Sequence, residues 1–109
     1  MKINYNDLKD SEEYYVYSLD FARGSYKVTR KIIPQKAKFT KRPKSSRGDF
    51  SNLKGKHLGD TWYTTFNVYD NLEEAVQDWN RELQEVLDKI ISEHESRVKY
   101  IESLKYGNI

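Results

Sequence analysis

The chain has 109 residues, enough for one domain with a modest core, and no cysteine, which excludes disulfides and thiolate metal sites. Its apolar fraction of 37% and charged fraction of 33% lean polar, while an aromatic fraction of 14% argues against wholesale disorder. The net charge of +2 is unevenly distributed. Residues 23–56, here called the basic region, hold twelve Lys and Arg against one acid, Asp49, whereas residues 70–109 hold ten acids and five bases. Such asymmetry favours oppositely charged partners.

Alternating side chains predict a β-hairpin over residues 13–33, in which Gly24 supplies the positive φ of the turn. We expect Pro34 to end the second strand, because proline cannot donate a hydrogen bond to a ladder. Ala37 and Phe39 beyond it suit a short edge strand with both side chains facing inward.

Residues 42–58 combine proline, glycines and many bases with little to bury, which predicts a basic, mobile loop inserted before the last strand. The alternation resumes over residues 61–69 and predicts that last strand. Together these segments predict an α+β fold with a three- or four-stranded antiparallel sheet, in a single domain spanning residues 1–109.

One long helix is predicted over about residues 71–106, because apolar residues recur at threes and fours from Leu72 to Leu104. Asp70 stands three residues before Glu73, the spacing of a capping box at a helix start. We expect this helix to pack on one face of the sheet. At 1.5 Å per residue it spans roughly 52 Å, against a radius of gyration of about 13 Å for a compact domain, so one end should overhang the sheet.

The overhanging end has two interpretations. The helix bends back near residues 92–96, or it packs against a second copy as a homodimer. The contact positions expected for the dimer are Leu87, Ile90, Ile91, Val98 and Ile101.

The basic region is the strongest functional signal. Its bases can neutralise phosphates while an aromatic side chain stacks on a nucleobase. Two other interpretations stay open: a solvated loop that keeps the protein soluble, and a surface that docks on an acidic protein or on the acidic helix of a second copy. The candidate contact residues are Lys36, Lys38, Lys41, Arg42, Lys44, Arg47, Lys54 and Lys56, with Phe39 and Phe50 as aromatic partners.

Nine tyrosines are many for this length, and Tyr14, Tyr63 and Tyr69 fall opposite the expected core face. Rigid aromatic side chains with a polar tip suit protein interfaces, so these three are candidates for one. The alternative is that the N-terminal segment around Ile3, Tyr5 and Leu8 shields this second face.

The sequence carries no metal-ligand or catalytic motif. His57 falls in the expected loop and His94 in the apolar stripe, with no spacing that would bring three ligands together. The acids of the helix repeat along a polar face, as in a solvated helix, and a chain of this size offers little room for a shielded pocket. We therefore expect no catalytic residue, no cofactor and no enzyme activity.

The opening MKINYNDL, the Lys-, Asn- and Tyr-rich usage and the passage from an aromatic strand into a helix in TWYTTFNVYDNLEEAVQDWNRELQEVLDKI resemble small uncharacterised proteins of phages and mobile elements of low-GC Gram-positive bacteria. The resemblance implies a non-enzymatic accessory role. No apolar run approaches the ~18 residues of a membrane span, and the first residues lack the apolar core of a signal peptide. We therefore expect no membrane partner and a location in the bacterial cytoplasm, or in the host cytoplasm if the protein is phage-encoded.

Two functions are expected from these observations. The first is a non-enzymatic protein whose basic region contacts nucleic acid, or a nucleic-acid-bound complex, without sequence specificity, since no named nucleic-acid-binding module matches. The second is a phage-type interaction module that inhibits or tethers an acidic bacterial protein.

Overall fold

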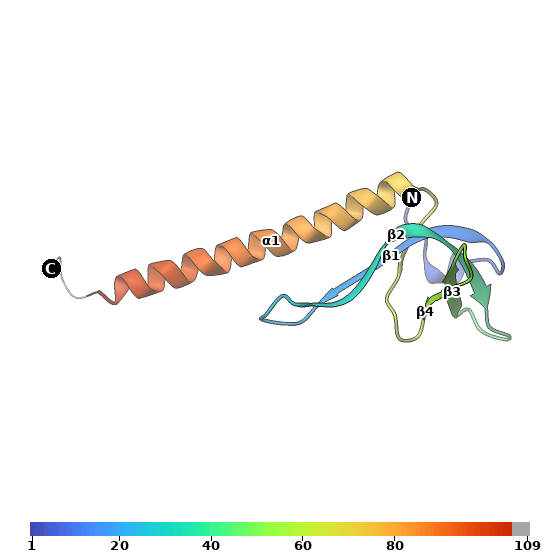
Figure 1. Cartoon of the computed structure of the whole chain (residues 1–109), viewed down its shortest axis with the longest axis horizontal. Coiled ribbons are helices and arrows are strands. Elements are labelled where there is room, and N and C mark those ends of the chain that lie inside the picture. The colour runs from blue at the N-terminus through green and yellow to red at the C-terminus, as the bar shows by residue number, and fades with distance from the viewer. Residues whose placement is uncertain (106–109) are drawn as a thin grey trace. The chain divides into compact units, whose positions relative to one another are not determined.

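The computed structural model describes residues 1–105, which form a five-stranded antiparallel sheet and one long helix. This confirms the α+β class, with more strands than the three or four expected. The strand order across the sheet is β4-β3-β2-β1-β5. Figure 1 labels β1, β2, β3 and β4 together with the long helix. In chain order the elements are the 3-10 turn η1 (Tyr5–Asp7), the strands β1 (Glu13–Phe21), β2 (Val28–Lys41), β3 (Gly48–Asn52), β4 (His57–Asp60) and β5 (Asn67–Tyr69), and the helix α1 (Leu72–Ser103).

The chain divides into two compact units. Met1–Trp79 holds the whole sheet together with the start of α1, and the second unit begins at Asn80 and holds the rest of the helix.

The hairpin of β1 and β2 forms as predicted, and Gly24 has a φ of 81° in its turn. Pro34, however, does not end the second strand, because β2 continues through it to Lys41. The pairing of β1 with β2 is irregular around Pro34, because Val16 pairs with Gln35 whereas Ser18 pairs with Ile32. On its other side, β2 pairs with β3 only from Ala37 onward. Pro34 thus lies at an irregularity without a β3 neighbour, a position where its missing N–H costs no ladder bond.

The expected loop over residues 42–58 is wrong, since it contains β3 and the beginning of β4. Phe50 of β3 lies directly opposite Phe39 of β2, with ring centroids 5.2 Å apart, and both side chains are fully buried. Gly48 allows the two strands to approach, because a Cβ at this position would lie 2.2 Å from the carbonyl oxygen of Thr40. The burial of Phe50 and the close strand approach that Gly48 permits therefore explain why this basic segment forms part of the sheet.

The expected strand over residues 61–69 is correct only for its last three residues, which form β5. Asp60 ends β4, and its carboxylate accepts the backbone N–H groups of Trp62 and Tyr63, each at 2.9 Å. This side-chain bonding is typical of an Asx turn, which competes with strand geometry. Trp62 and Tyr63 therefore lie in a turn instead of a ladder.

The core lies on one face of the sheet. Tyr14, Val16, Phe39, Phe50 and Val68 meet there, and the N-terminal segment covers them with Leu8 and, partly buried, Ile3 and Tyr5. The Tyr5 hydroxyl accepts the backbone N–H of Phe66 at 2.6 Å and lies 3.0 Å from the Phe66 carbonyl oxygen. The N-terminal segment is thereby fixed to the approach to β5.

The opposite face of β1 and β5 meets the start of α1. The ring of Trp79 packs edge-on against Tyr17, at 5.6 Å between centroids, and the Tyr69 hydroxyl donates to the Asp78 carboxylate. Ala75, in the first turns of the helix, is fully buried. The first two turns of α1 thus belong to the folded sheet unit.

The start of α1 matches the prediction, although its cap is Asn71 and not Asp70. The Asn71 side-chain oxygen accepts the backbone N–H of Glu74 at 2.9 Å, which satisfies one of the free donors of the first turn. The helix ends at Ser103, and the expected end at residue 106 lies outside the described residues.

Candidate functional site

The bases of the basic region concentrate around β2 and the two turns that flank β3. Residues 42–47 join β2 to β3 and residues 53–56 join β3 to β4, so the two turns lie at opposite ends of β3. Five residues of strand span about 17 Å at ~3.4 Å per residue. The bases are therefore spread along the sheet and do not form one compact patch.

Three of the twelve bases are matched to carboxylates. Arg30 pairs with Asp20 at 2.7 Å, Lys36 with Glu13 at 3.1 Å and Arg42 with Asp49 at 3.0 Å. Within the described part of the chain the other nine have no carboxylate within ion-pair distance: Arg23, Lys27, Lys31, Lys38, Lys41, Lys44, Arg47, Lys54 and Lys56. Most of the positive charge of the basic region thus remains available to an external anion.

One face of β2, β3 and β4, here called the open face, is accessible to solvent. Lys38, Ser51 and His57 are ladder neighbours across the three strands and share this face, because side chains directly opposite in a ladder project together. Thr40 and Asp49 form the adjacent row. The buried Phe39 and Phe50 project to the other side, so the open face is the polar surface of this half of the sheet.

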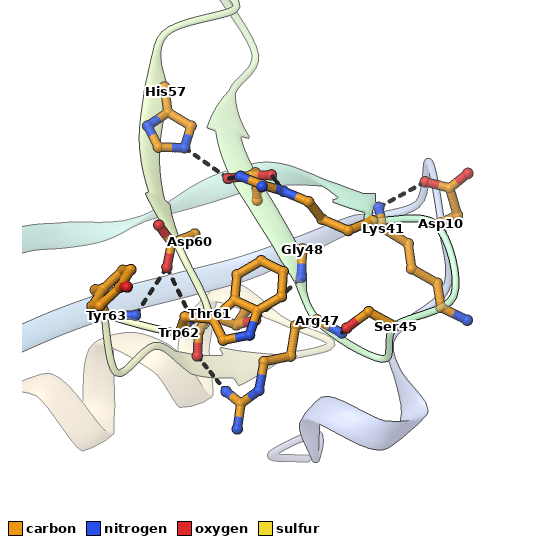
Figure 2. Close-up of polar contacts among 12 residues, drawn as sticks. Asp10, Lys41, Ser45, Arg47, Gly48, His57, Asp60, Thr61, Trp62 and Tyr63 are labelled. Atoms are coloured by element: carbon orange, nitrogen blue, oxygen red, sulfur yellow. Dashed lines mark hydrogen bonds and ion pairs between the residues drawn. The ribbon is translucent and has the colours of Figure 1, made fainter.

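Asp49 organises the charges at one end of the open face. Its carboxylate accepts two bonds from the Arg42 guanidinium, at 3.0 and 3.3 Å, and its Oδ1 lies 3.0 Å from Nε2 of His57. Figure 2 shows His57 on β4 turned toward this carboxylate. The hydrogen bond from Arg42 is the largest cause that holds the pKa of Asp49 below its ordinary value; partial desolvation opposes it, and the hydrogen bond with His57 adds a smaller lowering effect. Asp49 therefore stays ionised at neutral pH and neutralises Arg42.

Arg42 also stacks on an aromatic ring. Its guanidinium carbon lies 5.0 Å from the centroid of Trp62, a distance typical of a cation–π contact. Trp62 remains 45% exposed and its neighbour Tyr63 is 84% exposed. Sequence reasoning placed Trp62 in a strand and missed it as a site residue, although the preceding Gly59 and Asp60 are the residue types that open a turn.

Arg47 ties the turn of residues 42–47 to the segment that carries Trp62. Its guanidinium donates to the carbonyl oxygen of Thr61 at 2.6 Å (Figure 2). The neighbouring backbone is fixed as well, because Thr61 and Gly48 exchange hydrogen bonds at 2.9 and 3.2 Å. Trp62, Arg42 and Arg47 thus come together from two segments at one end of β3.

The structure corrects the expected stacking residues. Phe39 and Phe50 are fully buried, and Phe50 packs against Phe66 at 4.8 Å between ring centroids. Rings in the core cannot stack on a nucleobase. Of the aromatic side chains near the basic region, Trp62 and Tyr63 are exposed, whereas Tyr26 is half-buried and so is Tyr15, whose ring centroid lies 5.8 Å from the Lys36 ammonium.

Two of the three expected interface tyrosines are also buried. Tyr14 is 7% exposed because the N-terminal segment covers it, and its hydroxyl accepts the Lys9 backbone N–H. Tyr69 is 1% exposed, beside the start of α1. The N-terminal segment thus shields Tyr14, as the alternative interpretation of the sequence had it, whereas Tyr69 is shielded by the start of α1; of the three tyrosines, Tyr63 is the exposed one.

A surface cavity of about 290 Å³ lies where the first half of β2 meets the beginning of β4. Lys31 and Lys56 supply the positive charge of its lining, His57 adds an imidazole, and no carboxylate is part of its wall. Lys31 and His57 were not among the expected contact residues, because their proximity depends on the pairing of β3 between β2 and β4.

The apolar stripe of α1 beyond Asn80 stays accessible. The positions expected to form a dimer contact are between 41% and 58% exposed: Leu87, Ile90, Ile91, Val98 and Ile101. The homodimer through these positions remains a prediction.

Among the described residues, no three or more His, Asp or Glu side chains come together as a metal site. None of the helices described is both long and apolar enough to cross a membrane. Comparisons with protein-family models, curated protein sequences and solved structures returned no match.

Proposed function

We propose that this protein binds nucleic acid through contacts to the phosphate backbone, without reading the base sequence. The observation that carries the proposal is the set of nine bases of the basic region that have no carboxylate partner among the described residues. Each base that neutralises a phosphate releases condensed counterions, which is the main source of sequence-independent affinity. The two flanking turns are about 17 Å apart, which corresponds to about five base-pair steps of a duplex at ~3.4 Å each along the helix axis.

Trp62 supports single strands as the preferred form. Its ring is partly exposed, Arg47 donates to the carbonyl oxygen of the preceding Thr61, and the Arg42 guanidinium lies over the ring. A ring held next to bases in this way offers a stacking surface for an unpaired nucleobase, an interaction worth about 1–3 kcal/mol per base. A duplex keeps its bases stacked inside and gains nothing from the ring.

The test is the salt dependence of binding to a fluorescently labelled single-stranded DNA, with duplex DNA and RNA of the same length measured in parallel. Four phosphate contacts predict a log–log slope of about −2.8 for a single strand, so that affinity falls about 50-fold between 50 and 200 mM salt. An affinity that does not change with salt concentration, or no binding to any of the three nucleic acids at 50 mM salt, would refute the proposal.

A matched pair of variants locates the contact. Replacing Lys38 of the open face, Lys41 at the end of β2 and Lys44 of the following turn with Gln removes three charges that have no carboxylate partner among the described residues, and should lower the slope by about 2 and the affinity at least tenfold. Replacing Lys89, Lys99 and Lys105 of the second unit with Gln changes the net charge equally and should leave the affinity within about twofold. Equal losses in both variants would mean that only net charge matters.

A second candidate is an interaction with an acidic protein surface. The observation that favours it is exposed apolar and aromatic area close to the bases: Tyr63 at the Trp62 turn, Leu53 in the β3–β4 turn and Ile33 in β2. Protein interfaces combine such anchors with a polar rim. Capture of an acidic protein from a nuclease-treated bacterial lysate, lost on Tyr63→Ala, would support it; capture unaffected by Tyr63→Ala would count against it.

A further inference from the structure

The cavity between β2 and β4 differs from the rest of the basic region because it is concave. Two ammonium groups and an imidazole, from Lys31, Lys56 and His57, contribute to its wall. Elsewhere in this half of the sheet, a Lys or Arg side chain either forms an ion pair with a carboxylate, as Arg42 does, or extends from a strand or turn into solvent. A hollow with three nitrogen-bearing side chains and no carboxylate in its wall suits an anion.

The cationic side of the cavity is ordered by Asp49 and Asn52. Asp49 lies outside the cavity wall and holds Nε2 of His57 at 3.0 Å, which fixes the orientation of the ring. The Asn52 side-chain oxygen accepts the backbone N–H groups of Lys54 and Lys56, each at 2.9 Å. The turn that presents Lys56 is thus held from within, and the amide nitrogen of Asn52 remains as a donor at the wall.

The remaining wall is apolar. Ile32, Ile33 and Leu58 line it, and Ile33 is more than half exposed. Gln35 completes the lining, with its side-chain nitrogen donating to the carbonyl oxygen of Ile33 at 3.0 Å, so its side-chain oxygen is free to accept. Apolar side chains next to a few fixed polar groups form the usual composition of a small-molecule site.

We propose that this cavity holds one nucleotide unit, with its phosphate against Lys31, Lys56 and His57 and its base against Ile33 and Leu58. The volume of about 290 Å³ lies at the small end of ligand sites, which start near 300 Å³, and leaves room for a single nucleotide but not for two. The inference rests on the proposed function: a strand that passes Trp62 at one end of β3 reaches this cavity at the other. The phosphate can belong to a strand or to a free nucleotide, and the experiment separates these sources.

The test is a titration of the full-length, ¹⁵N-labelled protein with AMP, inorganic phosphate and uncharged adenosine, followed by backbone amide shifts. AMP should move the amides of Lys31, Ile33, Asn52 and Lys56 in a saturable way. Inorganic phosphate should move the same amides at higher concentration, and adenosine should move them least. Shifts confined to other residues, or equal effects of AMP and adenosine, would overturn the proposal.

The double variant Lys31→Gln with Lys56→Gln should weaken AMP binding at least tenfold, whereas Lys38→Gln with Lys44→Gln should leave it unchanged. The spectrum of each variant reports whether the fold is retained. If AMP binds here but oligonucleotides are not retained, the nucleic-acid function fails and the cavity stands as a site for free nucleotides. If oligonucleotides bind but AMP gives no shift and the Lys31 and Lys56 variant keeps full oligonucleotide affinity, the cavity inference alone is refuted.

Discussion

Asp49 is the one acid of the basic region, and its carboxylate contacts both the Arg42 guanidinium and the His57 imidazole. It neutralises Arg42 while that guanidinium lies over Trp62, and it orients His57 at the edge of the cavity. Its side chain is only 21% exposed, so solvent screens these contacts less than at a fully open position. Both ends of the proposed binding surface therefore depend on one carboxylate.

Asp49→Asn should lower the free energy of unfolding at neutral pH by about 1 kcal/mol, the range of partly exposed ion pairs with good geometry. Since the pKa of Asp49 is lower in the folded than in the unfolded chain, its stabilisation is fully present above the ordinary carboxyl pKa of about 3.9 and is lost as the pH falls through the lower folded value. Thermal melts of both proteins from pH 7 to pH 2 should show a gap in melting temperature that closes below about pH 4.

The control for this measurement is Asp7→Asn, because Asp7 has no ion-pair partner among the described residues. Its melting curves should follow those of the unaltered protein at every pH. An Asp49→Asn gap that stays constant down to pH 2 would show that the carboxylate charge contributes nothing to the fold.

At the scale of elements, the hairpin of β1 and β2 and the start of α1 were predictable because their patterns are long and local. β3 was not predictable, because the residues around Phe50 include glycine, aspartate and serine, which are uncommon in strands. This segment forms a strand because Phe50 pairs with Phe39 and Gly48 permits the close approach to β2. The turn at Asp60 was missed for a related reason: the side-chain bonds to Trp62 and Tyr63 override an alternating pattern. The candidate lysines could be found by counting charge, whereas Trp62 and the cavity required the strand pairing.

Helix α1 should contribute to stability unevenly along its length. Trp79→Ala removes the edge-on contact with Tyr17 and should cost about 2–3 kcal/mol, somewhat below the 3–5 typical of fully buried aromatic residues. Leu87→Ala, at a position 48% exposed, should change the free energy of unfolding by less than about 0.5 kcal/mol. Urea titrations of the two variants check this. A cost at Leu87 as large as that at Trp79 would show that a partner covers the apolar stripe.

At the scale of the whole molecule, the two units are stabilised by different means. Met1–Trp79 has a closed aromatic and aliphatic core, whereas the described helix beyond Asn80 has exposed apolar residues and local side-chain contacts such as Gln84 to Asp88 at 2.9 Å. Most helical stability in proteins comes from the packing of an apolar face, and along the roughly 24 residues of α1 from Asn80 to Ser103 that face is exposed. Local stability should therefore drop sharply along α1.

Hydrogen exchange should resolve this as two levels of protection. Amides of β1 and β2 should exchange only through global unfolding, and those from Glu85 to Ser103 much faster, through local opening of the helix.

If two copies pair through the stripe of Leu87, Ile90, Ile91, Val98 and Ile101, the slow level should extend into the helix as the protein concentration rises from micromolar to millimolar, because association stabilises the bound form by mass action. Light scattering should then show a mass rising above 13.0 kDa toward twice that value. Helix protection equal to that of β1 at micromolar concentration would contradict the two-level prediction. A constant 13.0 kDa with unchanged helix exchange would instead refute the homodimer, since an apolar stripe paired in solution cannot open as fast as one left in water.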